Sequence, residues 1–187
     1  MALTKTMFRA TGGRQNATPE TILSRLNGEI CRDNESCMFV TVFCCVLDIR
    51  TGQVAYSNAG HNLPYVLSNG AVMALPKTGG MALGVTEAVN FHAGQLLLKP
   101  EDRLVLYTDG VTEAMDKDNQ LFSESRLESI LRSLNGLNSK AVIETVVKEV
   151  QRFSTGAPQS DDITLLVIGY MESNGIDQHT LFVTLKN

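Results

Sequence analysis

Two groups of aspartates stand at the ends of strongly apolar segments. The run "LVLYTDG" ends in Asp109, followed at once by glycine, and "DDITLLVIGY" begins with Asp161 and Asp162. If both apolar segments are buried strands, these carboxylates meet at one edge of a sheet, where like charges repel unless a cation neutralises them. Hard oxygen ligands select magnesium, manganese or calcium. The residue types therefore indicate a metal-binding pair.

The same residues also have a purely structural explanation. An Asp-Gly pair after a strand is commonly a turn, and Ser-Asp-Asp before a strand is commonly a solvated loop or a cap. If Asp161 faces a metal, Asp162 is expected to cap or to face solvent, because neighbouring side chains of a strand point in opposite directions. His61, in "NAGHN", suits a general acid with its ordinary pKa of about 6.5, or equally the stabilisation of a tight turn. From the residues alone, both interpretations stay open.

Length, charge and cysteine content limit the classes of protein. The chain has 187 residues, is 43% hydrophobic and carries a formal net charge of −4, which suits one domain without a basic surface for nucleic acid. The longest apolar run, "MFVTVFCCVL", is too short to span a bilayer. The first residues do not resemble an export leader. The four cysteines lack zinc-site spacing, so we expect reduced, buried thiols and a cytoplasmic location.

Helical and strand-like segments alternate in blocks. Apolar residues recur at helical spacing in four segments, of which the second has Thr18 as a cap and Pro19 at its first position. These segments are 1–10, 19–30, 123–134 and 139–153. Strands grouped apart from helices predict an α+β fold with mainly antiparallel sheets flanked by helices.

Seven segments have the composition of strands: 39–47, 53–57, 64–67, 71–75, 91–98, 103–108 and 163–170. The first four are joined in pairs by "DIRTG" and "SNG", which are hairpin connections. The next two are expected to pair across "KPED". The last, "ITLLVIGY", is continuous and rich in β-branched residues, which predicts a central buried strand.

Four stretches of the sequence, in this order, resemble a known family. They are "FVTVFCCVLDIRTGQVAYSNAGHNLPYVL", "TGGMALGV", "LVLYTDGVTEAMDKDNQLFSESRL" and "GAPQSDDITLLVIGY". They are similar to the second half of the PPM-type metal-dependent serine/threonine protein phosphatases of bacteria, in the SpoIIE/RsbU-like branch. The similarity covers residues 1–170. It implies an α-β-β-α sandwich, of which this chain holds a part, with two magnesium or manganese ions at one end of the sheets.

The resemblance also implies an activity and two site residues. The aspartate of the family's Thr-Asp-Gly motif falls on Asp109, and the first acid of its closing Asp-Asp motif falls on Asp161; both are family metal ligands. The implied reaction is hydrolysis of phosphoserine or phosphothreonine on a protein by metal-activated water, without a protein nucleophile. The implied substrate is a phosphoprotein such as an anti-sigma-factor antagonist, in bacterial signalling or sigma-factor regulation.

One family motif is missing from this sequence. The family's first metal ligand lies in a Gly-Asp motif, and the sequence contains no Gly-Asp dipeptide. We therefore expect residues 1–170 to be a phosphatase domain without its N-terminal strands and first metal motif, nearly inactive alone and prone to self-association through uncovered edges. Alternatives are a catalytically silent, phosphatase-like binding or regulatory module and a calcium-bound structural domain. Residues 171–187 are expected to form a linker and the first strand of a further domain, or a disordered tail.

Overall fold

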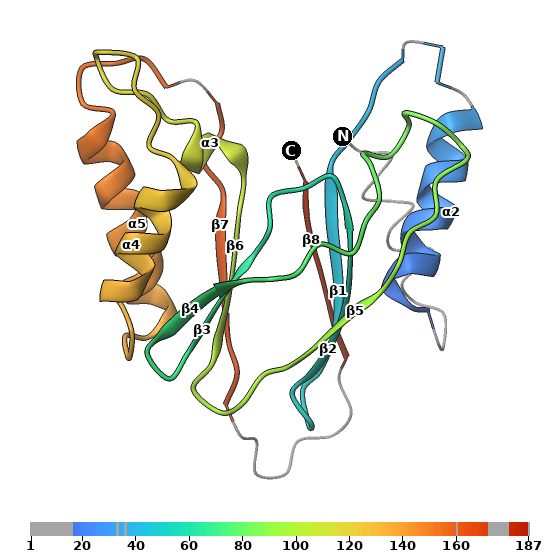
Figure 1. Ribbon diagram of the computed structural model, residues 1–187, viewed down its shortest axis with the longest axis horizontal. Helices are drawn as coiled ribbons and strands as arrows, with labels where there is room; N and C mark the ends of the chain where they lie inside the picture. The colour runs from blue at the N-terminus through green and yellow to red at the C-terminus, as the bar shows by residue number, and fades with distance from the viewer. Residues whose placement is uncertain (1–16, 33, 36, 160, 172–179, 187) are drawn as a thin grey trace. The chain divides into compact units, whose positions relative to one another are not determined.

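The structure is a computed structural model that describes residues 17–32, 34–35, 37–159, 161–171 and 180–186 (Figure 1). The helix expected over residues 1–10 lies outside this part of the chain. The chain divides into two compact units. The first comprises Met1–His61, Pro76–Leu97 and Ser173–Asn187, and the second comprises Asn62–Leu75 and Leu98–Glu172.

The first unit is built on a four-stranded antiparallel sheet with the strand order β5-β2-β1-β8. Its elements are α2 (Pro19–Arg32), β1 (Val42–Asp48), β2 (Gln53–Ala59), β5 (Gly94–Leu97) and β8 (Thr180–Lys186). The hairpin expected at "DIRTG" is confirmed, because β1 pairs with β2 and the amide of Gly52 donates to the carbonyl of Asp48 at 2.8 Å. Gly52 has a φ of 73°, which favours glycine at this position.

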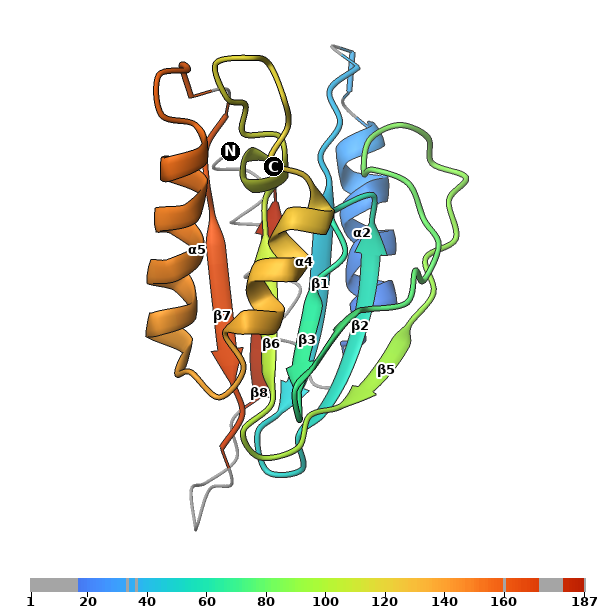
Figure 2. The same cartoon turned by 60° about the vertical axis from the view of Figure 1, so that its left-hand side comes forward.

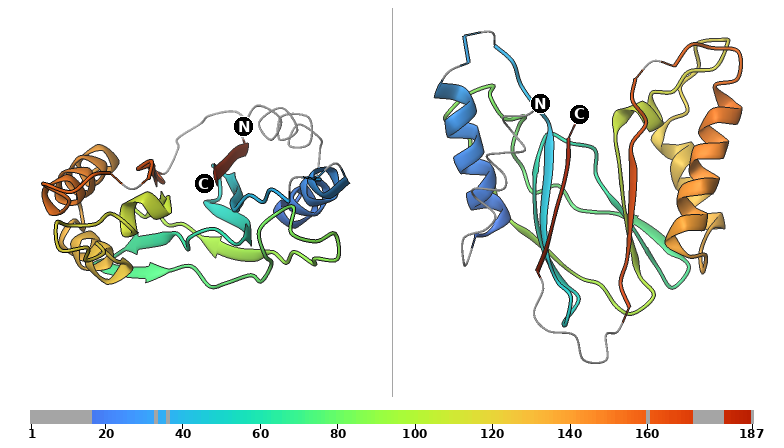
Figure 3. Two further views of the ribbon diagram at one scale, coloured as in Figure 1. Left: turned by 90° about the horizontal axis from the view of Figure 1, so that it is seen from above. Right: turned by 180° about the vertical axis from the view of Figure 1, so that it is seen from behind.

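Helix α2 runs along the sheet of the first unit (Figure 3). It begins at Pro19, as expected, and the carbonyl of Thr18 accepts the amide of Ile22 at 3.0 Å. Its apolar stripe of Ile22, Leu23 and Leu26 is buried in one cluster with residues of β1, of β2 and of the segment before β5. Those partners are Val42, Cys44, Ala59, Leu83 and Phe91. The stripe therefore attaches the helix to the sheet.

The second unit is built on another four-stranded antiparallel sheet, with the strand order β4-β3-β6-β7. Its strands are β3 (Tyr65–Ser68), β4 (Ala71–Ala74), β6 (Arg103–Tyr107) and β7 (Leu165–Gly169), and its helices are α3 (Asp109–Thr112), α4 (Glu124–Ser133) and α5 (Ser139–Phe153). The β3–β4 hairpin at "SNG" is confirmed. Asn69 and Gly70 both have positive φ, at 46° and 85°, as a two-residue hairpin turn of this kind requires.

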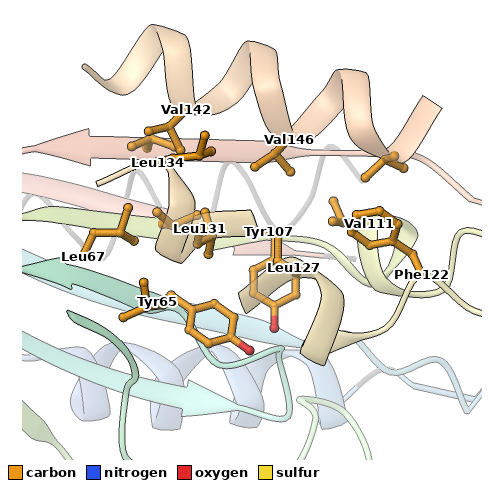
Figure 4. Packing of buried hydrophobic residues seen from close by; sticks show 14 of the residues in the cluster. Tyr65, Leu67, Tyr107, Val111, Phe122, Leu127, Leu131, Leu134, Val142 and Val146 are labelled. Atoms are coloured by element: carbon orange, nitrogen blue, oxygen red, sulfur yellow. The ribbon is translucent and has the colours of Figure 1, made fainter. Parts of the chain in front are cut away.

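Helices α4 and α5 cover one face of this second sheet (Figure 2). Leu127 and Leu131 of α4 and Val146 of α5 point into one buried cluster with the sheet residues (Figure 4). Burial of each such side chain contributes about 1.5–3 kcal/mol. All five residues of β6 are buried, so this strand is held on both sides by pairing and on its faces by packing. The core therefore fixes the position of Tyr107 and of the residues that directly follow it.

The expected pairing of residues 91–98 with 103–108 is wrong. Strand β5 pairs with β2 in the first unit, whereas β6 lies between β3 and β7 in the second. The turn in "KPED" is instead attached to the end of β7, because Glu101 donates to the carbonyl of Tyr170 and Tyr170 donates to that of Asp102, each at 2.9 Å. The buried carboxylate of Asp102 also accepts the amide of Lys99 at 2.8 Å. A short connection thus links two sheets instead of closing a hairpin.

The α+β class with antiparallel sheets and flanking helices is confirmed. The strand expected from residue 39 begins at Val42, because residues 39–41 contribute only an isolated bridge from Val40 to Leu83. Residues 180–186, expected to open a further domain, form β8 and pair with β1 in the first sheet. Within the described residues, no helix combines the length and hydropathy needed to cross a membrane.

Candidate metal centre

Asp109 directly follows the most buried strand of the second unit. Thr108 continues the extended backbone of β6, with φ −88° and ψ 161°, and Asp109 is the first residue of the one-turn helix α3. The Asp-Gly pair is therefore the start of a helix and not a turn. The carbonyl of Asp109 accepts the amide of Glu113 at 2.7 Å and the hydroxyl of Thr112 at 3.3 Å. Its half-buried carboxylate thus stands on a backbone that is held from both sides.

Thr108 ties the end of β6 to the segment that carries Asp161. Its amide donates to the carbonyl of Thr164 at 3.0 Å, and its hydroxyl accepts the amide of Thr164 at 2.9 Å. The same hydroxyl donates to the carbonyl of Asp162 at 3.0 Å. Thr108 is buried, so these bonds form where water competes poorly. The bonds of Thr108 therefore continue the attachment of the two segments beyond Tyr107 and Leu165, where the pairing of β6 with β7 ends.

Gly110 allows the two acidic segments to touch. A Cβ built on Gly110 would overlap the carbonyl oxygen of Asp162, and it would lie 3.3 Å from the carbonyl carbon of Asp161. The residue next to Asp109 is thus in van der Waals contact with the main chain of both acids of the "DD" pair. Any side chain at this position would push the segments apart.

Asp161 and Asp162 have exposed side chains. One carboxylate oxygen of Asp161 accepts the amide of Asp162 at 2.7 Å, and the carbonyl of Asp161 accepts the side-chain amide of Gln159 at 2.8 Å. For Asp162 the main-chain carbonyl is the group that contacts Thr108. The structure therefore brings together the segments of Asp109 and Asp161, as the apolar strands predicted, with Asp162 serving as the point of backbone attachment.

The ligand atoms available at this site are carboxylate oxygens, which are the type of ligand that a divalent cation such as magnesium binds. Magnesium is commonly bound through one or two carboxylates, with water and substrate phosphate completing its octahedron. Asp109 and Asp161 supply carboxylate oxygens on two segments in direct contact. Among the described residues, however, no group of three or more His, Cys, Asp and Glu side chains is placed to hold a metal ion. The two acids therefore fit part of a metal site.

His61 lies in the first unit and serves a turn. Its amide donates to the side-chain oxygen of Asn58 at 2.7 Å, and the side-chain amide of Asn58 donates to the carbonyl of His61 at 2.8 Å. Its ring nitrogen Nδ1 lies 3.4 Å from the hydroxyl of Thr41. The side chain is only 5% exposed. This geometry fits the structural interpretation of "NAGHN".

Sequence reasoning missed two residues that position the acids. Thr108 and Gly110 flank Asp109, and both act on the segment around Asp162. A threonine at the end of a buried strand and a glycine after the acid are the signals available in the sequence. Neither reveals its partner, because that partner lies more than fifty residues away in the chain.

Comparison with known proteins adds an independent line of argument. The family model of stage II sporulation protein E (SpoIIE) matches residues 1–170. Protein IcfG of Synechocystis sp. is 31% identical over 131 residues, which are 70% of this chain and 20% of that protein. Phosphoserine phosphatase RsbU of Bacillus subtilis is 22% identical over 152 residues, which are 80% of this chain and 44% of that protein. The chain thus spans less than half the length of either relative.

Solved structures share the fold. The RsbU and RsbW domains of Rv1364c from Mycobacterium tuberculosis match with a TM-score of 0.73 and 19% identity, over 94% of this chain and 48% of that one. The SiaA-PP2C domain of Pseudomonas aeruginosa matches with a TM-score of 0.71 and 24% identity, over 90% and 66%. The phosphatase domain of SpoIIE from Bacillus subtilis matches with a TM-score of 0.61 and 13% identity, over 94% and 74%. With the family model covering residues 1–170, these likenesses lead to one assignment: the chain belongs to the SpoIIE family.

Proposed function

We propose that this chain is a phosphatase domain that removes phosphate from phosphoserine or phosphothreonine on a protein, with Asp109 and Asp161 as ligands of magnesium or manganese. The observation that carries the proposal is the contact of Gly110 with the main chain of Asp161 and Asp162. That contact holds two carboxylate-bearing segments side by side, where their charges call for a cation.

The family assignment supports the reaction class. The SpoIIE family consists of PP2C-type phosphatases, which depend on metal ions and typically use manganese or magnesium. One relative of this chain is named as a phosphoserine phosphatase. We propose a phosphorylated anti-sigma-factor antagonist as the substrate, which is the substrate implied by the resemblance to the SpoIIE/RsbU-like branch and agrees with the name of that relative. We also propose a cytoplasmic setting, in which thiols such as those of Cys31, Cys37 and Cys44 stay reduced.

The residues of the site have separate tasks in this proposal. Bound magnesium or manganese would supply an activated water and offset the charge of the phosphate. Asp109 and Asp161 provide the carboxylate oxygens, Thr108 fixes the spacing of their backbones, and Gly110 permits the close approach. No residue of the chain is needed as a nucleophile.

The ligand set in this chain limits the expected activity. The sequence has no Gly-Asp dipeptide, so only Asp109 and Asp161 match the family's metal ligands. We propose that the chain alone binds manganese weakly and hydrolyses phosphoprotein slowly. Activity should therefore rise with manganese concentration without saturating in the micromolar range.

The test combines metal binding with turnover. Free manganese is measured by electron paramagnetic resonance for the unaltered chain, for Asp109→Asn and Asp161→Asn, and for the control Asp118→Asn. Asp118 is an exposed acid of the same unit, so the control makes the same change of charge. Phosphate release from a phosphoserine protein is measured in parallel.

We expect each of the two site variants to weaken manganese binding and to abolish the residual phosphate release, while the control behaves as the unaltered chain. Loss of binding that is equal in all three variants would mean that only overall charge matters. Manganese-independent phosphate release, or release unaffected by Asp109→Asn and Asp161→Asn, would contradict the proposal.

A further inference from the structure

Arg126 is held over two aromatic rings of the second unit. It lies in the first turn of α4, and the central carbon of its guanidinium is 4.3 Å from the ring centroid of Phe153 and 5.8 Å from that of Phe122. The two rings meet edge to face, with centroids 5.4 Å apart. Phe122 is 1% exposed and part of the core, whereas Arg126 is exposed. Cation–π attraction to the two rings favours this position of the guanidinium.

The guanidinium of Arg126 has no ion pair or hydrogen bond within the described residues. Four other arginines of the described residues have acidic neighbours. Arg132, for example, pairs with Glu128 on the same helix, and Arg103 lies 3.9 Å from Glu101. Cation–π attraction to the two rings uses none of the five N–H donors of the guanidinium. Arg126 is thus an ordered cation with free donors.

Arg126 stands at the end of the unit that carries Asp109 and Asp161. The amide of Ser123 donates to the carbonyl of Thr112 in α3 at 2.8 Å, so the start of α4 is bonded to the helix that Asp109 begins. Phe153 is the last residue of α5, and the loop after it leads to Asp161. In Figure 2, the start of α4, α3 and the end of α5 lie at the same end of the sheet.

We propose that Arg126 contacts an oxyanion of the phosphoprotein substrate, either the phosphate or a carboxylate beside it; this rests on the proposed function. The acids at this end of the unit repel an anionic substrate, and a fixed guanidinium offsets that repulsion. A guanidinium binds phosphate or carboxylate through two parallel, charge-assisted hydrogen bonds. Because the rings already order Arg126, little side-chain entropy is lost when it binds.

The test measures binding apart from turnover. Fluorescence anisotropy gives the affinity of a fluorescein-labelled phosphoserine peptide for the unaltered chain, Arg126→Met, Arg126→Lys and the control Arg132→Met. Methionine retains an apolar chain over Phe122 and Phe153 but carries no charge. Arg132 lies on the same helix and is paired with Glu128, so its replacement makes the same change of net charge away from the rings. Thermal unfolding of each variant records any loss of stability.

We expect Arg126→Met to weaken peptide binding about tenfold or more. Arg126→Lys should keep part of the affinity, and Arg132→Met should stay within about twofold of the unaltered chain. Inorganic phosphate as a competitor separates the two oxyanions. If it displaces the peptide from the unaltered chain but not from Arg126→Met, the contact is with phosphate. If Arg126→Met loses affinity, relative to the unaltered chain, only for peptides with acidic residues beside the phosphoserine, the contact is with a carboxylate.

Two results would overturn the inference: equal affinities of Arg126→Met and Arg132→Met, with Arg126→Met merely less stable, or no peptide binding by the unaltered chain. Manganese-dependent phosphate release, measured on the same samples, tests the proposed function separately. If Arg126→Met releases phosphate with an unchanged Michaelis constant, the proposed phosphatase function is supported and the proposed contact of Arg126 with substrate is contradicted. If the peptide binds in an Arg126-dependent way but no phosphate is released, the contact of Arg126 is supported and the proposed phosphatase function is contradicted.

Discussion

The backbone of Gly110 lies directly against the carbonyl group of Asp162, with no space between them for a side chain. The contact joins the helix begun by Asp109 to the segment that precedes β7. Since each segment carries one of the two acids proposed as metal ligands, the spacing of the acids depends on a residue that has no side chain.

Replacement of Gly110 by alanine tests this dependence. Its Cβ would overlap the carbonyl oxygen of Asp162, which is backbone and has little freedom to move. We expect Gly110→Ala to lose about 1–3 kcal/mol in the free energy of unfolding and to weaken manganese binding. Urea unfolding and manganese titration measure the two effects.

Gly28→Ala is the matched control for this substitution. Gly28 lies within α2, and a Cβ there meets nothing within 4 Å. Alanine is the better helix former, so this variant should be more stable by up to about 1 kcal/mol. A Gly110→Ala protein as stable as Gly28→Ala, with unchanged manganese affinity, would show that the contact at Asp162 is dispensable.

Removal of the Thr108 hydroxyl should loosen the same junction. Thr108→Val keeps the shape of the side chain but loses the hydrogen bonds to the amide of Thr164 and to the carbonyl of Asp162. We expect destabilisation of about 1–2 kcal/mol in urea unfolding. Thr108→Ser retains the hydroxyl and should recover most of the loss. Equal destabilisation by serine and valine would assign the effect to packing of the methyl group.

The core under α4 should be sensitive to truncation. Leu131 is fully buried in the cluster of α4, α5 and the second sheet, so Leu131→Ala should cost about 2–5 kcal/mol. Leu137 is 40% exposed in the following loop, and Leu137→Ala should change stability by no more than about 0.5 kcal/mol. Similar thermal midpoints for the two variants would contradict the assignment of α4 to the core.

Stability should fall in alkaline solution because of two stacked tyrosines. Tyr65 and Tyr107 have ring centroids 5.9 Å apart. Burial, followed by the neighbouring Tyr65, raises the pKa of Tyr107 above its ordinary value, and burial raises that of Tyr65 as well. The unfolded chain then ionises first. The stabilisation is complete below about pH 10 and is lost as the pH rises towards the pKa values of the folded state.

Tyr107→Phe isolates this contribution. The variant lacks the phenol whose pKa is most raised by burial, so its unfolding free energy should decline less steeply above about pH 10 than that of the unaltered chain. Urea unfolding from pH 8 to pH 11, monitored by circular dichroism, measures both slopes. Identical slopes would exclude Tyr107 as a source of the dependence.

Local patterns in the sequence were sufficient where the partner is near in the chain. Helix α2 begins at Pro19 because a proline without an amide hydrogen suits the first helical position. The hairpin at Asn69 and Gly70 follows from their tolerance of positive φ. The general position of the two acids could also be predicted from the apolar strands before Asp109 and after Asp162. The strand after Asp162 is, however, not the central buried strand expected, because β7 lies at the end of the described sheet and only Val167 of it is buried.

Patterns in the sequence were insufficient where distant partners compete. The turn around Glu101 and Asp102 looks like a hairpin, yet its backbone bonds go to Tyr170. Strands β5 and β6 therefore enter different sheets. In the same way, nothing near Thr108 indicates that its hydroxyl binds Thr164, because that contact exists only after β6 and β7 have paired.

The pairing of β1 with β8 has a kinetic consequence. Val42 lies opposite Lys186, so β1 cannot pair along this side until the chain has been synthesised as far as residue 186. Closing so long a loop is entropically costly, and sheets with such distant contacts fold slowly. During synthesis, the second unit is complete in sequence before β8 leaves the ribosome, whereas β1 must wait with one edge unpaired. Chaperone binding to nascent chains should therefore concentrate on the residues around β1.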